Sequence, residues 1–413
     1  MDVIILSIPI FFALIGLEVG YDVYQNKKGR KGKYRLNDAF TNISCGIMDQ
    51  LTGLFSKLFT VGSYVFAFEL LGAYRLWEWS GLWWHWVIAF IAIDLAYYWS
   101  HRVSHQVNLF WVGHVVHHQS EDYNLSVALR QGVFQKTLMF WVYLPLAAIG
   151  LPAEMFAVCM GFNLLYQFWI HTEYIKSMGP FEWVFNTPSH HRVHHGRNPK
   201  YIDKNHAGVL IVWDRLFGTF QKEDETPTYG ITRPTNTFNP VMAHAQPFIR
   251  LFRDIRSVPG LGDKLRFLFN SPGWYPASMG GSQDPPEIGT PKKYELKLPL
   301  SVNLYLFSQY FGLVGFSAFF LSINVNYSTS FQIGVVTLIM LNLLLMGGMF
   351  DARRKSRNLE WFRQLVNVAF AILLFFQYHG ILPTTVLIGF VTISVLWFLR
   401  VNKHLPNVKF PLA

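Results

Sequence analysis

The 413-residue chain is poor in charge, with 51% hydrophobic, 17% aromatic and only 15% charged residues. Soluble proteins carry about 25% charged residues, and a soluble chain with fewer would expose large apolar patches to water. Its mean hydropathy of +0.23 therefore indicates an integral membrane protein. The chain has a net charge of +10. In membrane proteins such an excess of Lys and Arg lies mostly in cytoplasmic loops that face anionic lipid, so it does not imply a nucleic-acid partner. The chain has only two cysteines, Cys45 and Cys159. They are too few for a disulfide framework, an iron–sulfur cluster or a cysteine-type zinc site.

Hydrophobic runs recur along the chain at close to the ~20 residues that cross about 30 Å of hydrocarbon. The first run lacks the small-residue cleavage site of a signal peptide and is interpreted as a retained anchor. The second is the weakest, because Asp49, Lys57 and Glu69 interrupt it. We therefore predict an all-α integral membrane protein, a multi-span helical bundle with nine spans at about 3–21, 49–72, 83–100, 134–150, 153–170, 301–322, 331–350, 361–378 and 380–399.

Basic loop residues orient this bundle, because cytoplasmic loops are enriched in Lys and Arg. Loops 323–330 and 379–382 contain neither residue and are assigned to the opposite side. With alternating spans, the amino terminus is expected outside or in a lumen, and the carboxyl terminus in the cytoplasm. The basic residues behind this orientation are Lys27, Lys28, Arg30, Lys31, Lys33 and Arg35 after the first span, Arg353, Arg354, Lys355 and Arg357 in loop 351–360, and Arg400, Lys403 and Lys409 in the tail.

Residues from about 172 to 298 are polar and rich in Pro and Gly, which predicts a cytoplasmic cap of short helices and loops. The expected organisation has four parts. They are N-terminal spans with a basic loop (1–82), a catalytic domain (83–245), a cytoplasmic linker (246–298) and a C-terminal four-span hydrophobic module (299–413).

Ten of the fifteen histidines lie between residues 101 and 195, and their spacing is regular. Residues at i, i+3 and i+4 of a helix share one face, so each cluster can direct two or three imidazoles at a common point. All clusters fall at predicted cytoplasmic ends of spans or in adjoining loops, where they can converge. The clusters are His101 and His105, then His114, His117 and His118, then His191, His194 and His195, with His171 between them.

Neutral imidazoles bind Fe, Zn, Cu and Ni, and nine of them exceed the coordination of one ion, so the pattern predicts two metals. A solvated patch or a pH sensor is the alternative without metal. No His-Glu-x-x-His motif of a zinc protease occurs. A histidine-lined metal transporter remains a rival, although transport ligands are expected in the middle of spans.

Two carboxylates are candidates to orient these imidazoles. Asp94 lies two helical turns before His101 inside an apolar span and is expected to accept a hydrogen bond from a ligand ring. An ion pair of Asp94 with Arg102 or Arg130 is equally compatible with the sequence. The remaining expectations are that Glu173 supports His171, that His190 points away from the shared face, and that His206 is an isolated loop residue.

Longer stretches around the histidines resemble the alkylglycerol monooxygenases, within the fatty acid hydroxylase and sterol desaturase superfamily of integral-membrane di-iron enzymes. The resemblance is strong across about 35–245. The stretches that carry it are 94–118, Ser120–Gln131, Phe162–Glu173, Asn186–Asn198, Gly208–Phe220 and Tyr229–Phe238.

The resemblance implies hydroxylation beside the ether oxygen of 1-O-alkylglycerols or their lyso-phospholipid relatives, after which the hemiacetal breaks into a fatty aldehyde and a glycerol. It implies two iron ions and O2, held by the nine histidines named above. Animal members, which take electrons from tetrahydrobiopterin, carry a Glu where this chain has Gln106. The donor therefore stays open between a pterin, a cytochrome and a ferredoxin-type partner.

Alternative functions are a sterol or fatty-acyl hydroxylase or desaturase of the same superfamily and, from another class, the metal transporter. The expected partners are a lipid substrate, the bilayer and an external electron donor. The expected location is the endoplasmic reticulum in a eukaryote or the cytoplasmic membrane in a bacterium, with the active site on the cytoplasmic side.

Overall fold

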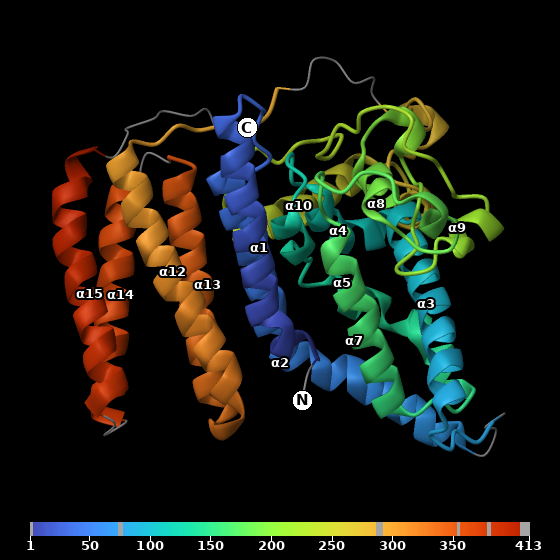
Figure 1. Cartoon of the computed structure of the whole chain (residues 1–413), viewed down its shortest axis with the longest axis horizontal. Coiled ribbons are helices and arrows are strands. Elements are labelled where there is room, and N and C mark those ends of the chain that lie inside the picture. The colour runs from blue at the N-terminus through green and yellow to red at the C-terminus, as the bar shows by residue number, and fades with distance from the viewer. Residues whose placement is uncertain (1–2, 73–76, 286–291, 353–355, 378–380, 405–413) are drawn as a thin grey trace. The chain divides into compact units, whose positions relative to one another are not determined.

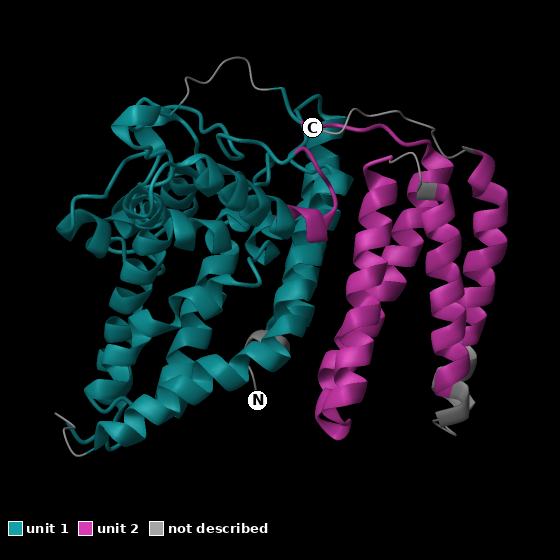
Figure 2. Cartoon of the chain, turned by 180° about the vertical axis from the view of Figure 1, so that it is seen from behind, with its two compact units in different colours: residues 1–235, 244–293 teal, residues 236–243, 294–413 magenta. Residues whose placement is uncertain are grey.

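The computed structural model describes residues 3–72, 77–285, 292–352, 356–377 and 381–404. Every regular element among them is a helix, and the one extended pairing there is the isolated bridge Phe185–Leu210. The prediction of an all-α chain is confirmed. Two compact units divide the molecule, residues 1–235 with 244–293 and residues 236–243 with 294–413 (Figure 2).

The first unit contains the longer helices α1, α2, α3 and α7 and several short ones (Figure 1). Helices α3 and α7 pack against each other along their lengths. The helix bounds in this unit are α1 Val3–Lys27, α2 Leu36–Leu70, α3 Trp83–Gln106, α4 Asn108–His118, α5 Gln135–Met139, α6 Leu144–Ala148, α7 Ala153–Trp169, α8 Pro188–His195, α9 Val212–Leu216, α10 Pro240–Ser257 (whose first four residues belong to the second unit) and α11 Leu261–Phe269.

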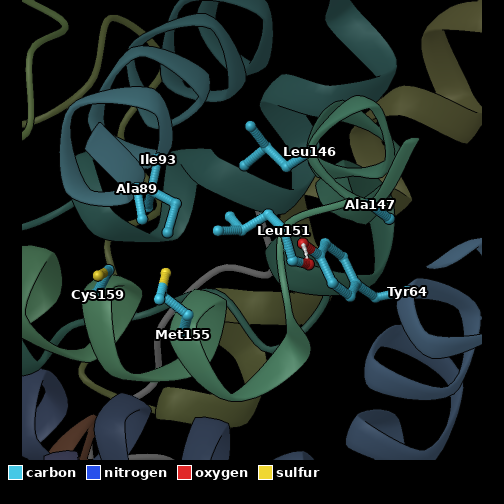
Figure 3. Packing of buried hydrophobic residues seen from close by; sticks show 8 residues of the cluster. All are labelled: Tyr64, Ala89, Ile93, Leu146, Ala147, Leu151, Met155 and Cys159. Carbon is cyan, nitrogen blue, oxygen red and sulfur yellow. Dashed lines mark hydrogen bonds between the residues drawn. The ribbon is translucent and has the colours of Figure 1, made fainter. Parts of the chain in front are cut away.

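A buried apolar cluster between α2, α3, α6 and α7 forms a core of this unit (Figure 3). Tyr64 of α2 lies at its edge and donates its hydroxyl hydrogen to the carbonyl oxygen of Leu151, 2.9 Å away, which satisfies the polar end of an otherwise apolar contact. The remaining members are Ala89, Ile93, Leu146, Ala147, Met155 and Cys159. This cluster fixes α3 and α7, the two helices that lead to the histidines.

The second unit is a bundle of α12 (Leu300–Ile323), α13 (Thr329–Phe350), α14 (Ser356–Gln377) and α15 (Ile381–Val401). A buried polar network crosses it. Arg363 of α14 pairs with Glu360 at 2.6 Å and donates to Asn342 of α13 at 2.9 Å and Gln309 of α12 at 3.0 Å. Buried charges are stable only when paired and hydrogen-bonded, so this network fixes how α12, α13 and α14 pack.

Four helices in the described parts of the chain are long and apolar enough to cross a membrane, namely Leu6–Lys27, Leu36–Leu70, Leu300–Asn326 and Thr329–Phe350. The prediction of a single span at 134–150 is wrong. That segment forms α5, a 3-10 turn and α6 in direct succession, and its helical residues 135–148 extend only about 21 Å, short of the roughly 30 Å of hydrocarbon. Arg353, Arg354, Lys355 and Lys409, which contributed to the predicted orientation, lie outside the described residues.

Candidate metal centre

Nine buried histidines form two groups. Within each group, one ring nitrogen from every residue lies within 4.8 Å of the others, and each side chain is only 1–6% exposed. The first histidine group contains His101, His105, His114, His118 and His194. The second histidine group contains His117, His171, His191 and His195. All nine histidines selected from the sequence are thus brought together, and their burial contradicts a solvated histidine patch.

The turn between α3 and α4 creates the first group. Val107 adopts an extended conformation (φ −122°, ψ 120°), ends α3 and precedes α4 directly. This one-residue break folds α4 back so that the last turns of α3 face the His114–His118 face of α4. The sequence Asn-Thr-Pro-Ser then starts α8, with Pro188 in its first turn, where a missing N–H is tolerated.

Each His-x-x-His-His cluster is shared between the groups. Residues i and i+4 enter one group and residue i+3 enters the other: His114 and His118 join the first group while His117 joins the second. His194 likewise joins the first group, whereas His191 and His195 join the second. The cause is the helix period, because i+3 and i+4 lie about 100° apart around the axis. Each cluster therefore directs two imidazoles, not three, at one point.

The facing nitrogen atoms lie at distances that fit shared ions. In the first group, His114 Nε2 is 3.1 Å from His101 Nε2 and 3.0 Å from His118 Nε2. In the second group, His171 Nε2 is 3.0 Å from His191 Nε2 and 3.4 Å from His117 Nε2. Two ligands bound at about 2.1 Å with angles of roughly 90–110° stand about 3.0–3.4 Å apart. The separations of these nitrogens are therefore compatible with a cation between them.

Backbone carbonyl oxygens orient the rings from outside. The Nδ1 atoms of His101, His117, His171 and His194 lie 2.7–3.0 Å from the carbonyl oxygens of His206, Arg130, Gln167 and Lys204, respectively. An Nδ1–H that donates outward leaves Nε2 free to bind metal, which is the usual arrangement of metal-ligating histidines.

Asp94 and Glu173 do not support ligand rings, so these predictions are wrong. Asp94 accepts hydrogen bonds from Asn163 Nδ2 (2.6 Å), the Val209 and Leu210 N–H groups (2.9 and 3.0 Å) and Trp213 Nε1 (2.9 Å). Because none of these partners is an arginine, the alternative prediction of an ion pair between Asp94 and an arginine is also wrong. The reason is distance, since seven residues span about 10.5 Å of helix. Glu173 instead pairs with Lys33 at 2.5 Å.

Burial keeps the nine rings neutral, which is the form that binds metal. It lowers the pKa of His117 to about 4, because a charged ring loses hydration in the interior. Burial also lowers the pKa of His105 and His195 well below the ordinary value, and the neighbouring imidazoles lower it further. The site therefore presents uncharged nitrogen donors at neutral pH.

Comparisons with known proteins agree with this arrangement. A family model described as fatty acid hydroxylase matches residues 86–219, which include all nine histidines. Alkylglycerol monooxygenase of Xenopus tropicalis is 39% identical over 382 residues, covering 90% of this chain and 83% of the relative. The human alkylglycerol monooxygenase is 40% identical over 366 residues, covering 87% and 80%. The chain belongs to the alkylglycerol monooxygenase family. No solved structure matches it.

Two further histidines near the site of this alkylglycerol monooxygenase family member differ in position. His190 lies outside both groups, with its ring centroid 5.4 Å from that of Phe220, as expected. The expectation that His206 is isolated is wrong. Its ring centroid lies 5.0 Å from that of His105. No helical spacing relates His206 to the other clusters, so sequence periodicity could not reveal it.

Gln106, the position singled out by the family resemblance, lies beside Arg102. Its Oε1 accepts a hydrogen bond from Arg102 Nε at 3.3 Å. Gln106 is the last residue of α3 and follows His105 directly, so a change of charge there would act next to the first group.

A cavity of about 430 Å³ borders the histidines of this family member. His105, His118 and His194 of the first group and His195 of the second lie in its wall. The wall is otherwise partly apolar, with Trp111, Val112, Val115, Ile202, Ile231, Leu251 and Phe267. Its charged side chains are Arg197, Arg233, Arg250, Asp203, Asp254 and Asp284, of which Arg233 and Asp254 form an ion pair. The cavity provides space for a substrate next to both groups.

Proposed function

We propose that this chain is an integral-membrane monooxygenase that holds two iron ions and uses O2 to cleave the ether bond of 1-O-alkylglycerols. The observation that carries the proposal is the pair of buried histidine groups, containing five and four imidazoles, beside one cavity. Two irons bound there would supply an oxidant strong enough for a C–H bond beside an ether oxygen. The nine histidines would act as the ligands and as the catalytic centre.

The protein's own residues would bind the lipid, orient it and exclude water. Apolar residues such as Val112 and Leu251 would hold the alkyl chain near the ether carbon, and Arg197 or Arg250 would contact oxygens of the polar end. In the balanced reaction, one oxygen atom of O2 enters the C–H bond and the other becomes water, using two electrons and two protons. The hemiacetal then breaks its C–O bond to give a fatty aldehyde and glycerol.

The electrons would come from an external donor, since two free, buried cysteines cannot hold an iron–sulfur cluster that would store them. Tetrahydrobiopterin is one candidate donor, and Gln106 is the residue that we expect to influence its use. A cytochrome or a ferredoxin-type protein is the alternative.

We further propose that the site faces the cytoplasm, in the endoplasmic reticulum of a eukaryote or the cytoplasmic membrane of a bacterium. Lys33 pairs with Glu173, two residues after His171, and Arg35 Nε lies 2.7 Å from Asp122 Oδ2. The basic loop after α1 therefore lies on the same side of the first unit as the histidines, and basic loops are retained in the cytoplasm. We place the catalytic part at 83–245, preceded by 1–82 and followed by the linker 246–298 and the hydrophobic module 299–413.

The test is incubation of the purified, iron-loaded chain with a 1-O-alkylglycerol, O2 and alternative reductants. Release of fatty aldehyde that requires both iron and O2 supports the proposal. Hydroxylated or desaturated acyl or sterol products, with the ether intact, would favour the other enzymes of the superfamily. Metal flux into proteoliposomes without oxygen consumption would favour a transporter.

A further inference from the structure

His206 lies at the edge of the first histidine group. Its side chain is 0% exposed. Its ring centroid lies 5.0 Å from that of His105 and 5.7 Å from those of His101 and His194. Centroids of neighbouring members within the group are 4.4–5.2 Å apart, so His206 is nearly as close to His105 as these members are to one another.

The ring of His206 lacks the hydrogen bonds that buried histidines elsewhere in the chain have. Neither of its ring nitrogens makes a hydrogen bond of acceptable geometry, although the backbone of Asp203 lies close enough for one of them to reach it. By contrast, His85 Nδ1 accepts from the Ser80 N–H at 3.0 Å, and His244 Nε2 lies 3.2 Å from the Gln131 carbonyl oxygen. An unsatisfied buried polar atom is unfavourable, so the ring nitrogen that does not face Asp203 requires a partner.

The backbone holds His206 in this place. Its N–H donates to Asp214 Oδ1 and the Ala207 N–H donates to Asp214 Oδ2, both at 2.8 Å. Its carbonyl oxygen accepts from His101 Nδ1 at 2.8 Å. The same residue thus orients one ligand ring with its backbone and places its own ring beside three others.

We propose that His206 is a sixth nitrogen ligand for the ion of the first histidine group, an inference that rests on the proposed metal pair. The five nitrogens of that group lie within 4.8 Å of one another without it, so His206 joins from the edge by turning its ring. Imidazole is a ligand for iron, and an additional donor at the edge of the first group would make its ion slower to release than the ion of the second group.

The experiment measures iron retention in the full-length chain loaded with ferrous iron without oxygen. A chelator is added and the iron remaining per chain is followed by elemental mass spectrometry. We expect release in two phases from the unmodified chain, with His206→Gln accelerating the slower phase by about tenfold or more. The matched control is His190→Gln, which changes a buried histidine outside both groups and should leave both phases unchanged.

A second variant separates ligand loss from misfolding. The space left by His206→Ala adjoins His105 and His194, which line the cavity, so free imidazole has a route to it. We expect added imidazole to restore slow release in His206→Ala. Unchanged release in His206→Gln, or faster release in His206→Ala without rescue, would overturn the ligand role. If the unmodified chain retains no iron at all, the proposed metal pair fails instead.

Discussion

His118 and His195 stack ring on ring, with centroids 4.4 Å apart and planes at 27°, and this pair joins the two histidine groups. Each group also takes residues from both α4 and α8. The two groups are therefore built from the same short helices, and neither can form without the other's supporting elements. This shared construction leads to the first prediction.

Removing one ligand from either group should remove one ion and stop turnover. We expect His117→Ala, in the second group, and His194→Ala, in the first, to lower bound iron from about two to about one per chain and turnover by about a hundredfold or more. Elemental analysis and an aldehyde assay measure both effects, and a monodisperse elution in detergent controls for folding. Full activity in either variant would contradict the assignment of that histidine.

Asp94→Asn should destabilise the first unit although Asp94 contacts no ligand. The carboxylate accepts four hydrogen bonds, whereas an amide directs two N–H donors at groups that are themselves donors. We expect a loss of about 2–4 kcal/mol, measured by thermal unfolding in detergent. The control is Glu173→Gln, where a partly exposed ion pair with Lys33 is worth at most about 1 kcal/mol. Equal stability of Asp94→Asn and the parent would refute this account of Asp94.

The metal-free protein should lose stability as the pH falls from about 6.5 to about 4. The folded-state pKa of His117 is about 4 because the ring is buried, whereas an unfolded histidine titrates near 6.5. Between these values the unfolded chain binds more protons than the folded one, so acidification favours unfolding. His117 alone contributes about 3 kcal/mol to this dependence.

Melting temperatures of chelator-treated protein between pH 7.5 and 5 provide the measurement. The variant His117→Gln, which cannot titrate at this position, should show a shallower dependence. A melting temperature that stays constant or rises on acidification would show that the buried rings are not kept neutral.

Gln106→Glu should raise the rate supported by tetrahydrobiopterin relative to the rate supported by a protein donor. The change places a carboxylate beside Arg102, directly after His105, where the family resemblance implies a Glu in animal members. Parallel assays with the two donors provide the comparison, and Gln106→Leu controls for the loss of the amide. An unchanged ratio of the two rates would make this position irrelevant to the reductant.

Eight of the nine ligand candidates were selected by their i, i+3 and i+4 spacing, as with His101 and His105, whereas His171 was indicated only by its place between the clusters and by the family resemblance. That His117 joins the second group and His194 the first was not predictable, because the helix period separates i+3 from i+4 but the packing of α4 against α8 decides which group each residue enters. Backbone partners such as the Arg130 carbonyl oxygen have no sequence signal. His206 belongs to a loop held by Asp214, a contact that no periodicity encodes.

The all-α class of the fold was predictable from the sequence, whereas the bounds of its membrane spans were less so. The hydrophobicity of 134–150 indicated one long helix, but hydropathy cannot show that the segment folds into short helices. Hydropathy also missed the first part of α2, which begins at Leu36, before its apolar run. The polar residue Asn42 is tolerated in its buried face because it bonds to Asp38 and Ser126, both at 3.0 Å, and to Arg130 at 2.9 Å.

The central claim is that oxygen from O2 enters the carbon beside the ether oxygen. The most direct measurement supplies 18O2 with a 1-O-alkylglycerol and an effective reductant, and reduces the released aldehyde at once to an alcohol so that its oxygen cannot exchange with water. We expect one 18O atom in the fatty alcohol and none in the glycerol. A fatty product whose oxygen comes from water, or an ether that remains intact while the irons are bound, would contradict the account.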